Sequence, residues 1–204
     1  MAGGARPSAT DASHEENWHG GYYELAIKLG PADDTRLDTA LTVLWEFARL
    51  VGPFRRGSGA DAPVTSAALL DGPLNAVAAI PGLGPTLASV MVVREEGDEA
   101  GRTVIGNDWL DLCLPLGALG NLRVGVGAYP FDDGPDPRGW REPIEDWFAA
   151  IAGHVFAAVP FLHAITGEDV SGTEPSEALE GRTALMRPDG RGGLSVDPVR
   201  TWSW

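Results

Sequence analysis

Two nine-residue stretches of the chain carry the same alternation of apolar and polar side chains. The first spans Tyr22 to Gly30 and the second spans Trp109 to Gly117. Side chains of a β-strand point alternately to the two faces of its sheet. Each stretch therefore predicts a strand with one apolar face that is buried under helices. The apolar face carries Tyr23, Leu25, Ile27 and Leu29 in the first strand and Leu110, Leu112, Leu114 and Leu116 in the second.

A helical pattern follows each of these strands. After the first, Asp33 or Asp34 can cap a helix that ends before Gly52 and Pro53. Its apolar positions recur at helical spacing and are Leu37, Leu41, Leu44, Ala48 and Val51. After the second, a loop rich in Gly, Pro and Asp leads to a helix in which Pro143 suits the first turn. Its apolar stripe comprises Ile144, Trp147, Phe148, Ile151, Val155 and Val159.

Hairpin patterns at 89–105 and 183–196 complete two similar series of elements. We therefore predict an α+β fold of two pseudo-repeated strand-helix-strand-hairpin units, with the helices packed on one face of a mainly antiparallel sheet. Residues 18–204 would form a single domain with halves at about 18–106 and 107–204. Residues 1–17 are small and polar without periodicity, so we expect a disordered leader there.

This order of elements resembles that of tandem βαβββ metalloenzymes of the vicinal oxygen chelate type. The resemblance would imply His and Glu metal ligands on the strands. Glu24 and Asp111 are the only candidates on the first strands, and no histidine accompanies them. Four further potential ligands straddle the end of the expected leader, which lacks the rigid frame of a zinc site, and they are His14, Glu15, Glu16 and His19. We therefore expect no metal and no cofactor.

Composition narrows the class of partner. The 204-residue chain is 44% hydrophobic, with a formal charge of −14. Nucleic acid and anionic membranes are poor partners because phosphate binding needs clustered cations. The single cysteine forms no internal disulfide, and the N-terminus lacks the apolar core of a secretory signal, so the cytoplasm is expected. We expect a monomer or a homodimer.

The polar faces of the two predicted strands are the candidate active site. Pseudo-symmetry would bring Glu24 and Asp111 together as an acid and base pair, because two close carboxyls have separated pKa values. Tyr22, Lys28, Trp109 and Cys113 would surround them. The alternative is that this face is solvated, or covered by the loops at 57–85 and 123–140. Cys113 could be a nucleophile beside His163, although a lone strand cysteine is more often a buried hydrophobe.

Acidic residues cluster at 95–99, 132–136 and 168–180, and Trp140, Trp147, Trp202 and Trp204 lie near them or at the end of the chain. Together they predict an acidic, Trp-bearing surface that captures a basic protein. An immunity-type inhibitor of a basic toxin is one such function. A small-molecule enzyme or ligand-binding protein that uses Glu24 and Asp111 is the alternative. The residues expected to bind the partner or ligand are Tyr22, Lys28, Trp109, Glu95, Glu96, Glu168 and Asp169.

Overall fold

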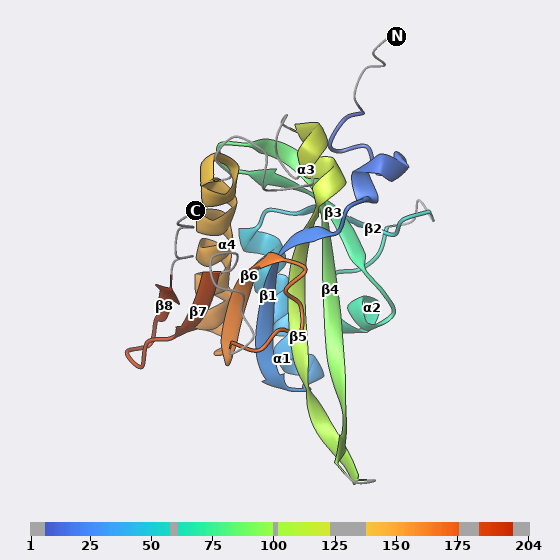
Figure 1. Ribbon diagram of the computed structural model, residues 1–204. Coiled ribbons are helices and arrows are strands. Elements are labelled where there is room, and N and C mark those ends of the chain that lie inside the picture. The colour runs from blue at the N-terminus through green and yellow to red at the C-terminus, as the bar shows by residue number, and fades with distance from the viewer. Residues whose placement is uncertain (1–6, 58–60, 100–101, 123–137, 176–183, 198–204) are drawn as a thin grey trace, which may run out of the picture.

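The computed structural model describes residues 7–57, 61–99, 102–122, 138–175 and 184–197, with the backbone alone at 96–99, 102–105 and 138–139. Within these ranges, eight strands form one antiparallel sheet in the order β2-β3-β4-β5-β1-β6-β7-β8 (Figure 1). The strands are β1 (Tyr22–Pro31), β2 (Val51–Phe54), β3 (Leu74–Ile80), β4 (Gly84–Glu99), β5 (Arg102–Pro115), β6 (His163–Glu168), β7 (Ala184–Pro188) and β8 (Leu194–Asp197). The helices are the 3-10 helix η1 (Glu15–Trp18), α1 (Asp34–Phe47), α2 (Ser66–Leu70), α3 (Leu116–Leu122) and α4 (Arg138–Ala158).

The two strands predicted from the alternating pattern, β1 and β5, pair at the centre of the sheet. Leu25 lies opposite Leu112, and Ile27 lies opposite Leu110. Directly paired residues point to the same face, so the apolar side chains of both strands share one face. The prediction that they are buried is confirmed, since Leu25, Ile27, Leu110 and Leu112 are fully covered.

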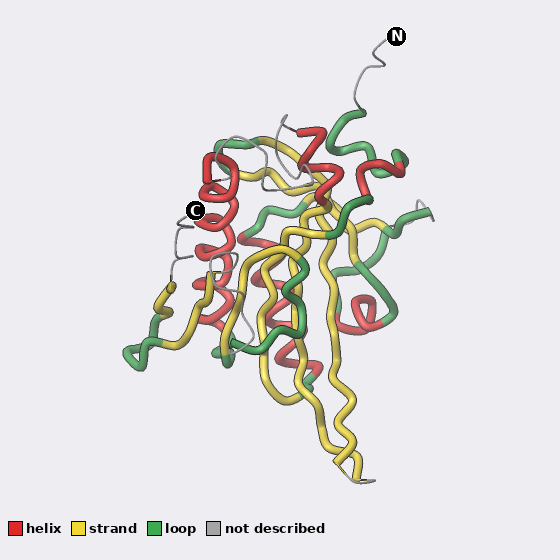
Figure 2. Tube along the Cα trace, in the orientation of Figure 1, coloured by secondary structure: helices red, strands yellow, loops and turns green. Residues whose placement is uncertain are grey.

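Helices α1 and α4 cover this apolar face and contact each other (Figure 2). Their inward side chains share one hydrophobic core with β1 and β5. Asp33 is the N-cap of α1, where its side chain accepts a hydrogen bond from the Arg36 N–H. Helix α4 begins at Arg138, earlier than expected, so Pro143 lies inside the helix rather than in its first turn.

The chain before β1 differs from the expected disordered leader. Residues 7–18 form turns and η1, and they lie against α3 and the start of β4. Asn17 is fully buried, where its side-chain amide donates to the carbonyls of Ser8 and Asp11 and its side-chain oxygen accepts from Asn121. These tertiary contacts order a segment that has no periodic pattern of its own.

Strands β4 and β5 continue beyond the other strands as a two-stranded arm, residues 96–99 and 102–105, which extends from the lower end of the sheet in Figure 1. Within the arm, Glu96 pairs with Ile105 and Glu99 pairs with Arg102. At its root, a Cβ on Gly106 would lie 1.7 Å from the Glu95 carbonyl oxygen, so this close approach requires glycine. The arm carries the backbone of residues 96–99 beyond the other strands of the sheet.

The two predicted halves are connected differently in the sheet. Strand β2 follows α1 and lies at the sheet edge, whereas β6 follows α4 and pairs with β1. The expected boundary between residues 106 and 107 falls inside β5. The sequence repeat therefore coincides with two central strands and two helices, and the strands that follow those helices occupy different places. Duplication stays a prediction.

Candidate functional site

The polar face of β1 and β5 is the face opposite the helices. Glu24 pairs with Cys113, Ala26 with Asp111, and Lys28 with Trp109. Alternation therefore brings Glu24, Asp111 and Lys28 to one face, as the sequence predicted. All three are buried: Glu24 is 3% exposed, Asp111 0% and Lys28 7%. The predicted site residues gather, but they do not form an open surface.

A short segment after β6 covers this face. We call residues 169–174 the strap; it crosses in front of β1 and β5 in Figure 1. The Ser171 N–H donates to Glu24 Oε1 at 2.6 Å, and the Ser171 hydroxyl is 2.6 Å from Asp111 Oδ2. One serine thus bridges both candidate catalytic carboxyls. The cover comes from the strap instead of the loop at 57–85; most of the other expected loop, 123–140, lies outside the described residues.

Both ends of the strap are attached to the sheet. Asp169 donates its N–H to the Tyr22 carbonyl and accepts the Tyr22 N–H on Oδ1, both at 3.1 Å. At the other end, Glu174 forms an ion pair with Lys28. Between them, Val170 belongs to a small apolar cluster with Ala26, Trp109, Ile165 and Leu185. The strap is therefore held by polar bonds at three points and by one buried apolar side chain.

Burial changes the acid–base chemistry of this face. Desolvation raises the pKa of Asp111 to about 7, with a further contribution from the negative charge of Glu24. Desolvation also raises the pKa of Glu24. Both carboxyls therefore have raised pKa values, a feature that is common at catalytic sites. A substrate, however, would reach it only after the strap moves.

Cys113 and His163 do not form a nucleophile and base pair. The Cys113 thiol is fully buried and lies 3.4 Å from Glu24 Oε2. Burial raises the pKa of the Cys113 thiol well above its ordinary value, so the thiolate is disfavoured. The His163 ring packs edge-on against Trp109, with 5.3 Å between centroids. Desolvation lowers the pKa of His163, which favours the neutral ring.

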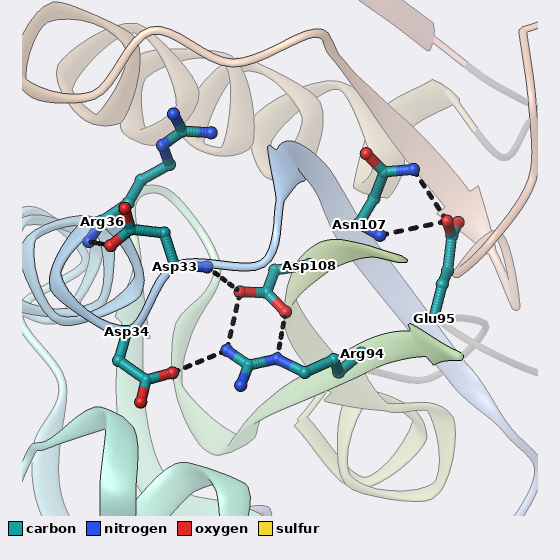
Figure 3. Close-up of polar contacts among 7 residues, drawn as sticks. All are labelled: Asp33, Asp34, Arg36, Arg94, Glu95, Asn107 and Asp108. Atoms are coloured by element: carbon teal, nitrogen blue, oxygen red, sulfur yellow. Dashed lines mark hydrogen bonds and ion pairs between the residues drawn. The ribbon is translucent and has the colours of Figure 1, made fainter. Parts of the chain in front are cut away.

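The root of the arm is fixed by a second polar network (Figure 3). Arg94 donates from Nε to Asp108 Oδ1 at 2.7 Å and from Nη2 to Asp108 Oδ2 at 2.9 Å. Arg94 also pairs with Asp34 at 2.8 Å, and Asp108 accepts the Asp33 N–H. Because Asp33 and Asp34 begin α1, this network ties the arm to the helix layer. The bonds, first of all with Asp108, raise the pKa of Arg94.

Several acidic residues that the sequence assigned to a partner surface have internal partners. Glu95 accepts hydrogen bonds from the Trp109 indole and the Asn107 amide, both at 2.8 Å. These bonds, first of all the one from Trp109, lower the pKa of Glu95. Asp169 accepts a hydrogen bond from the Tyr22 N–H, and Glu168 also has an interaction partner within the protein. The side chain of Glu96 lies outside the described residues.

The expectation of surface tryptophans is wrong where the structure tests it. Trp140 is 6% exposed and Trp147 is 8% exposed, and both belong to the main core. Trp109 is fully buried. Trp140 and Trp147 lie on α4 and pack into the main core, and Trp109 packs against Val170 of the strap. Burial of these large rings removes more apolar area from water than surface positions would. Trp202 and Trp204 lie outside the described residues.

Sequence reasoning missed Ser171, Glu174 and the Arg94–Asp108 pair. Ser171 lies in a Gly- and Asp-containing segment typical of a surface turn, and it meets Glu24 across 147 positions of sequence. No local pattern encodes such a contact. The Arg94 pair had a weak signal, since Asp108 precedes the second strand and Arg94 precedes the hairpin turn.

Comparisons with protein-family models, with curated proteins and with solved structures give no match. Within the described ranges, no helix combines the length and the hydropathy that crossing a bilayer requires. The function is therefore inferred from the geometry and charge of this chain alone.

Proposed function

We propose that this protein is an acidic binding protein that captures a basic protein partner through the arm formed by β4 and β5. An immunity-type inhibitor, which would occupy the cationic site of a toxin, is one concrete form of this function. The cytoplasm is the proposed compartment. The observation that carries the proposal is the arm itself, because it extends an acidic run of sequence beyond the body of the protein.

The charge of the arm differs from that of an ordinary hairpin. Its outgoing strand contains Glu96, Asp98 and Glu99, and its return strand contains one cation, Arg102. The whole chain carries −14, so the field of the body has the same sign as that of the arm. Fields of this kind accelerate the capture of a cationic partner.

Two of the described cations near the arm are already paired. Arg94 binds Asp108 and Asp34, and Lys28 binds Glu174 and lies 3.7 Å from Glu95. These pairs fix the root of the arm and the face beside it. A rigid root supports recognition because less conformational entropy is lost when the partner binds.

The closed polar face favours a binding role over catalysis. Glu24 and Asp111 are bridged by Ser171 and covered by the strap, so a substrate does not reach them in this arrangement. The tryptophans of the described residues lie mainly in the core, so the proposed surface is acidic without the expected aromatic anchors.

A small-molecule enzyme or ligand-binding protein is the second candidate. The observation that favours it is Asp111, whose pKa of about 7 suits a general acid or base near neutral pH. Glu24 would then be its partner. This function requires a state in which the strap has moved off the face.

Affinity capture with two matched variants tests the binding function. The arm variant combines Glu96→Gln, Asp98→Asn and Glu99→Gln. The control variant combines Glu142→Gln, Asp146→Asn and Asp197→Asn, which removes three exposed carboxylates elsewhere. Wild type and control should retain the same basic protein from lysate at low salt, and the arm variant should lose it. Equal capture by all three proteins would contradict recognition through the arm, and absence of any captured basic protein would contradict the function.

A further inference from the structure

The strap covers a carboxyl group that is poorly suited to ionisation. Asp111 is fully buried, and its Oδ2 accepts the Ser171 hydroxyl. Its Oδ1 has no hydrogen-bond partner among the described residues. A buried carboxylate with an unpaired oxygen carries a large desolvation penalty, whereas the neutral acid carries a much smaller one. The closed strap therefore fits the protonated form of Asp111 better than the ionised form.

The charged and titratable groups around Asp111 strengthen this preference. Glu24 on β1 shares the Ser171 bridge with Asp111 and repels a second negative charge. On β4, Met91 lies opposite Asp111 and does not titrate. The other titratable or charged groups on this face, among the described residues, come from the strands and the strap: Tyr22 and Lys28 from β1, Glu95 from β4, Cys113 from β5, His163 from β6, Arg187 from β7, and Asp169 and Glu174 from the strap.

The lysine on this face is already paired with other carboxylates. Lys28 forms its ion pair with Glu174 and lies 3.7 Å from Glu95, over the Trp109 ring. Glu24, in contrast, accepts the Ser171 N–H and has the Cys113 thiol beside it. The hydrogen-bond donors on this face therefore contact Glu24, Glu95 and Glu174. Among the described residues, Asp111 accepts a side-chain hydrogen bond only from the Ser171 hydroxyl.

We infer that the strap is a proton-dependent latch, which stays closed while Asp111 holds a proton and opens when Asp111 ionises. Opening brings water to Asp111 and Glu24 and uncovers Trp109 and Ala26, which Val170 now covers. The latch is independent of what the arm binds, and it would regulate access to the polar face of β1 and β5.

The difference in the pKa of Asp111 between the closed and open states sets how strongly opening of the strap depends on pH. The pKa of Asp111 is about 7 with the strap closed and would return toward its ordinary value of 3.8 in water. The equilibrium constant for opening then rises roughly tenfold from about pH 6 to about pH 8. The reason is that the closed state holds the Asp111 proton at the start of this range, whereas the open state has already lost it. Protonation of His163 at the lower pH acts on the same strap, so the contribution of Asp111 must be separated from it.

Hydrogen exchange at the Ser171 amide measures opening directly, because this N–H is bonded to Glu24 in the closed state. The experiment compares wild type with Asp111→Asn, whose amide oxygen can still accept the Ser171 hydroxyl. Exchange rates are divided by the intrinsic rate at each pH. The ratio of wild-type to variant opening should rise roughly tenfold from about pH 6 to about pH 8. The contribution of His163 is common to both proteins and cancels in this ratio.

A ratio that stays constant with pH would overturn the latch. Ser171→Ala provides a second variant that retains Asp111 and removes the hydroxyl bond, and its strap should open more at every pH. If Asp111→Asn does not fold, the titration midpoint of the Asp111 carboxyl is measured in wild type by ¹³C NMR and compared with that of Asp197. A midpoint close to that of exposed Asp197 would contradict the proposal, and a clearly higher midpoint would support it.

Discussion

Arg94 and Asp108 face each other across β4 and β5, where the arm leaves the sheet, and form two parallel hydrogen bonds of 2.7 and 2.9 Å. Asp108 is 1% exposed, so its charge depends on this guanidinium and on the Asp33 N–H. The same Arg94 reaches Asp34 in the first turn of α1. The position of the arm and the start of the helix layer are therefore stabilised by one residue.

Arg94→Lys should destabilise the protein by about 1–2 kcal/mol, because an ammonium group cannot form the bidentate pair of hydrogen bonds with Asp108. Chemical denaturation measures the change. Arg191→Lys, at an exposed position beyond β7, is the matched control and should change stability little. Equal effects of the two substitutions would show that the Arg94 pair does not stabilise the root of the arm.

Asp111→Asn should change how stability depends on pH. The pKa of Asp111 is raised from 3.8 to about 7, so the folded chain holds this proton more tightly than the unfolded chain does. The free energy of unfolding should therefore fall as pH rises from about 4 to about 7, by on the order of 4 kcal/mol from this group. The Asn variant should lack this fall and exceed wild type in stability above neutral pH.

Denaturation at a series of pH values tests this prediction. Asp197→Asn, an exposed carboxyl on β8, is the control and should follow the wild-type curve. Parallel curves for wild type and Asp111→Asn would mean that Asp111 ionises in the folded protein as readily as in the unfolded chain.

Much of the layered architecture could be predicted from the sequence, because period-two and helical spacing are local properties of the chain. The buried alternation of β1 and β5 followed from Leu25 and Leu112 in this way. The strap could not be predicted, because Ser171 contacts Glu24 only through the fold. The ordered segment at 7–18 was missed for the same reason: its stability comes from contacts such as the one between Asn17 and Asn121.

Gly117→Ala should destabilise the contact between α3 and the segment at 7–18. A Cβ at Gly117 would lie 1.9 Å from the Glu16 carbonyl oxygen, and backbone atoms cannot move away independently. We expect a loss of about 1–3 kcal/mol, as for other overpacked sites. Gly153→Ala is the opposite case, because nothing lies within 4 Å of its added Cβ on α4.

Gly153→Ala should stabilise the helix by up to about 1 kcal/mol, since alanine has the higher helix propensity. Thermal unfolding of both variants against wild type gives the comparison. Two stabilised variants would show that the 7–18 segment does not pack on α3.

Leu112→Ala should destabilise the protein by about 2–5 kcal/mol, because it leaves a cavity between the central strands and the helices. Leu112 is fully buried, whereas Leu162 is 53% exposed and serves as the matched control. Urea denaturation should show a clear loss for the first variant and a small one for the second. A Leu112 variant as stable as the Leu162 variant would contradict the central position of β5 in the core.

The association rate with the captured basic partner, measured against ionic strength, tests the central claim most directly. Wild type, the arm variant (Glu96→Gln, Asp98→Asn, Glu99→Gln) and the control variant (Glu142→Gln, Asp146→Asn, Asp197→Asn) differ in where charge is removed, and the two variants carry the same net charge. We predict fast wild-type association at low salt that slows markedly as the screening length shortens to about 8 Å. The arm variant should be slower and less dependent on salt, with the control close to wild type. Identical rates and salt dependence for the two variants would contradict recognition through the arm.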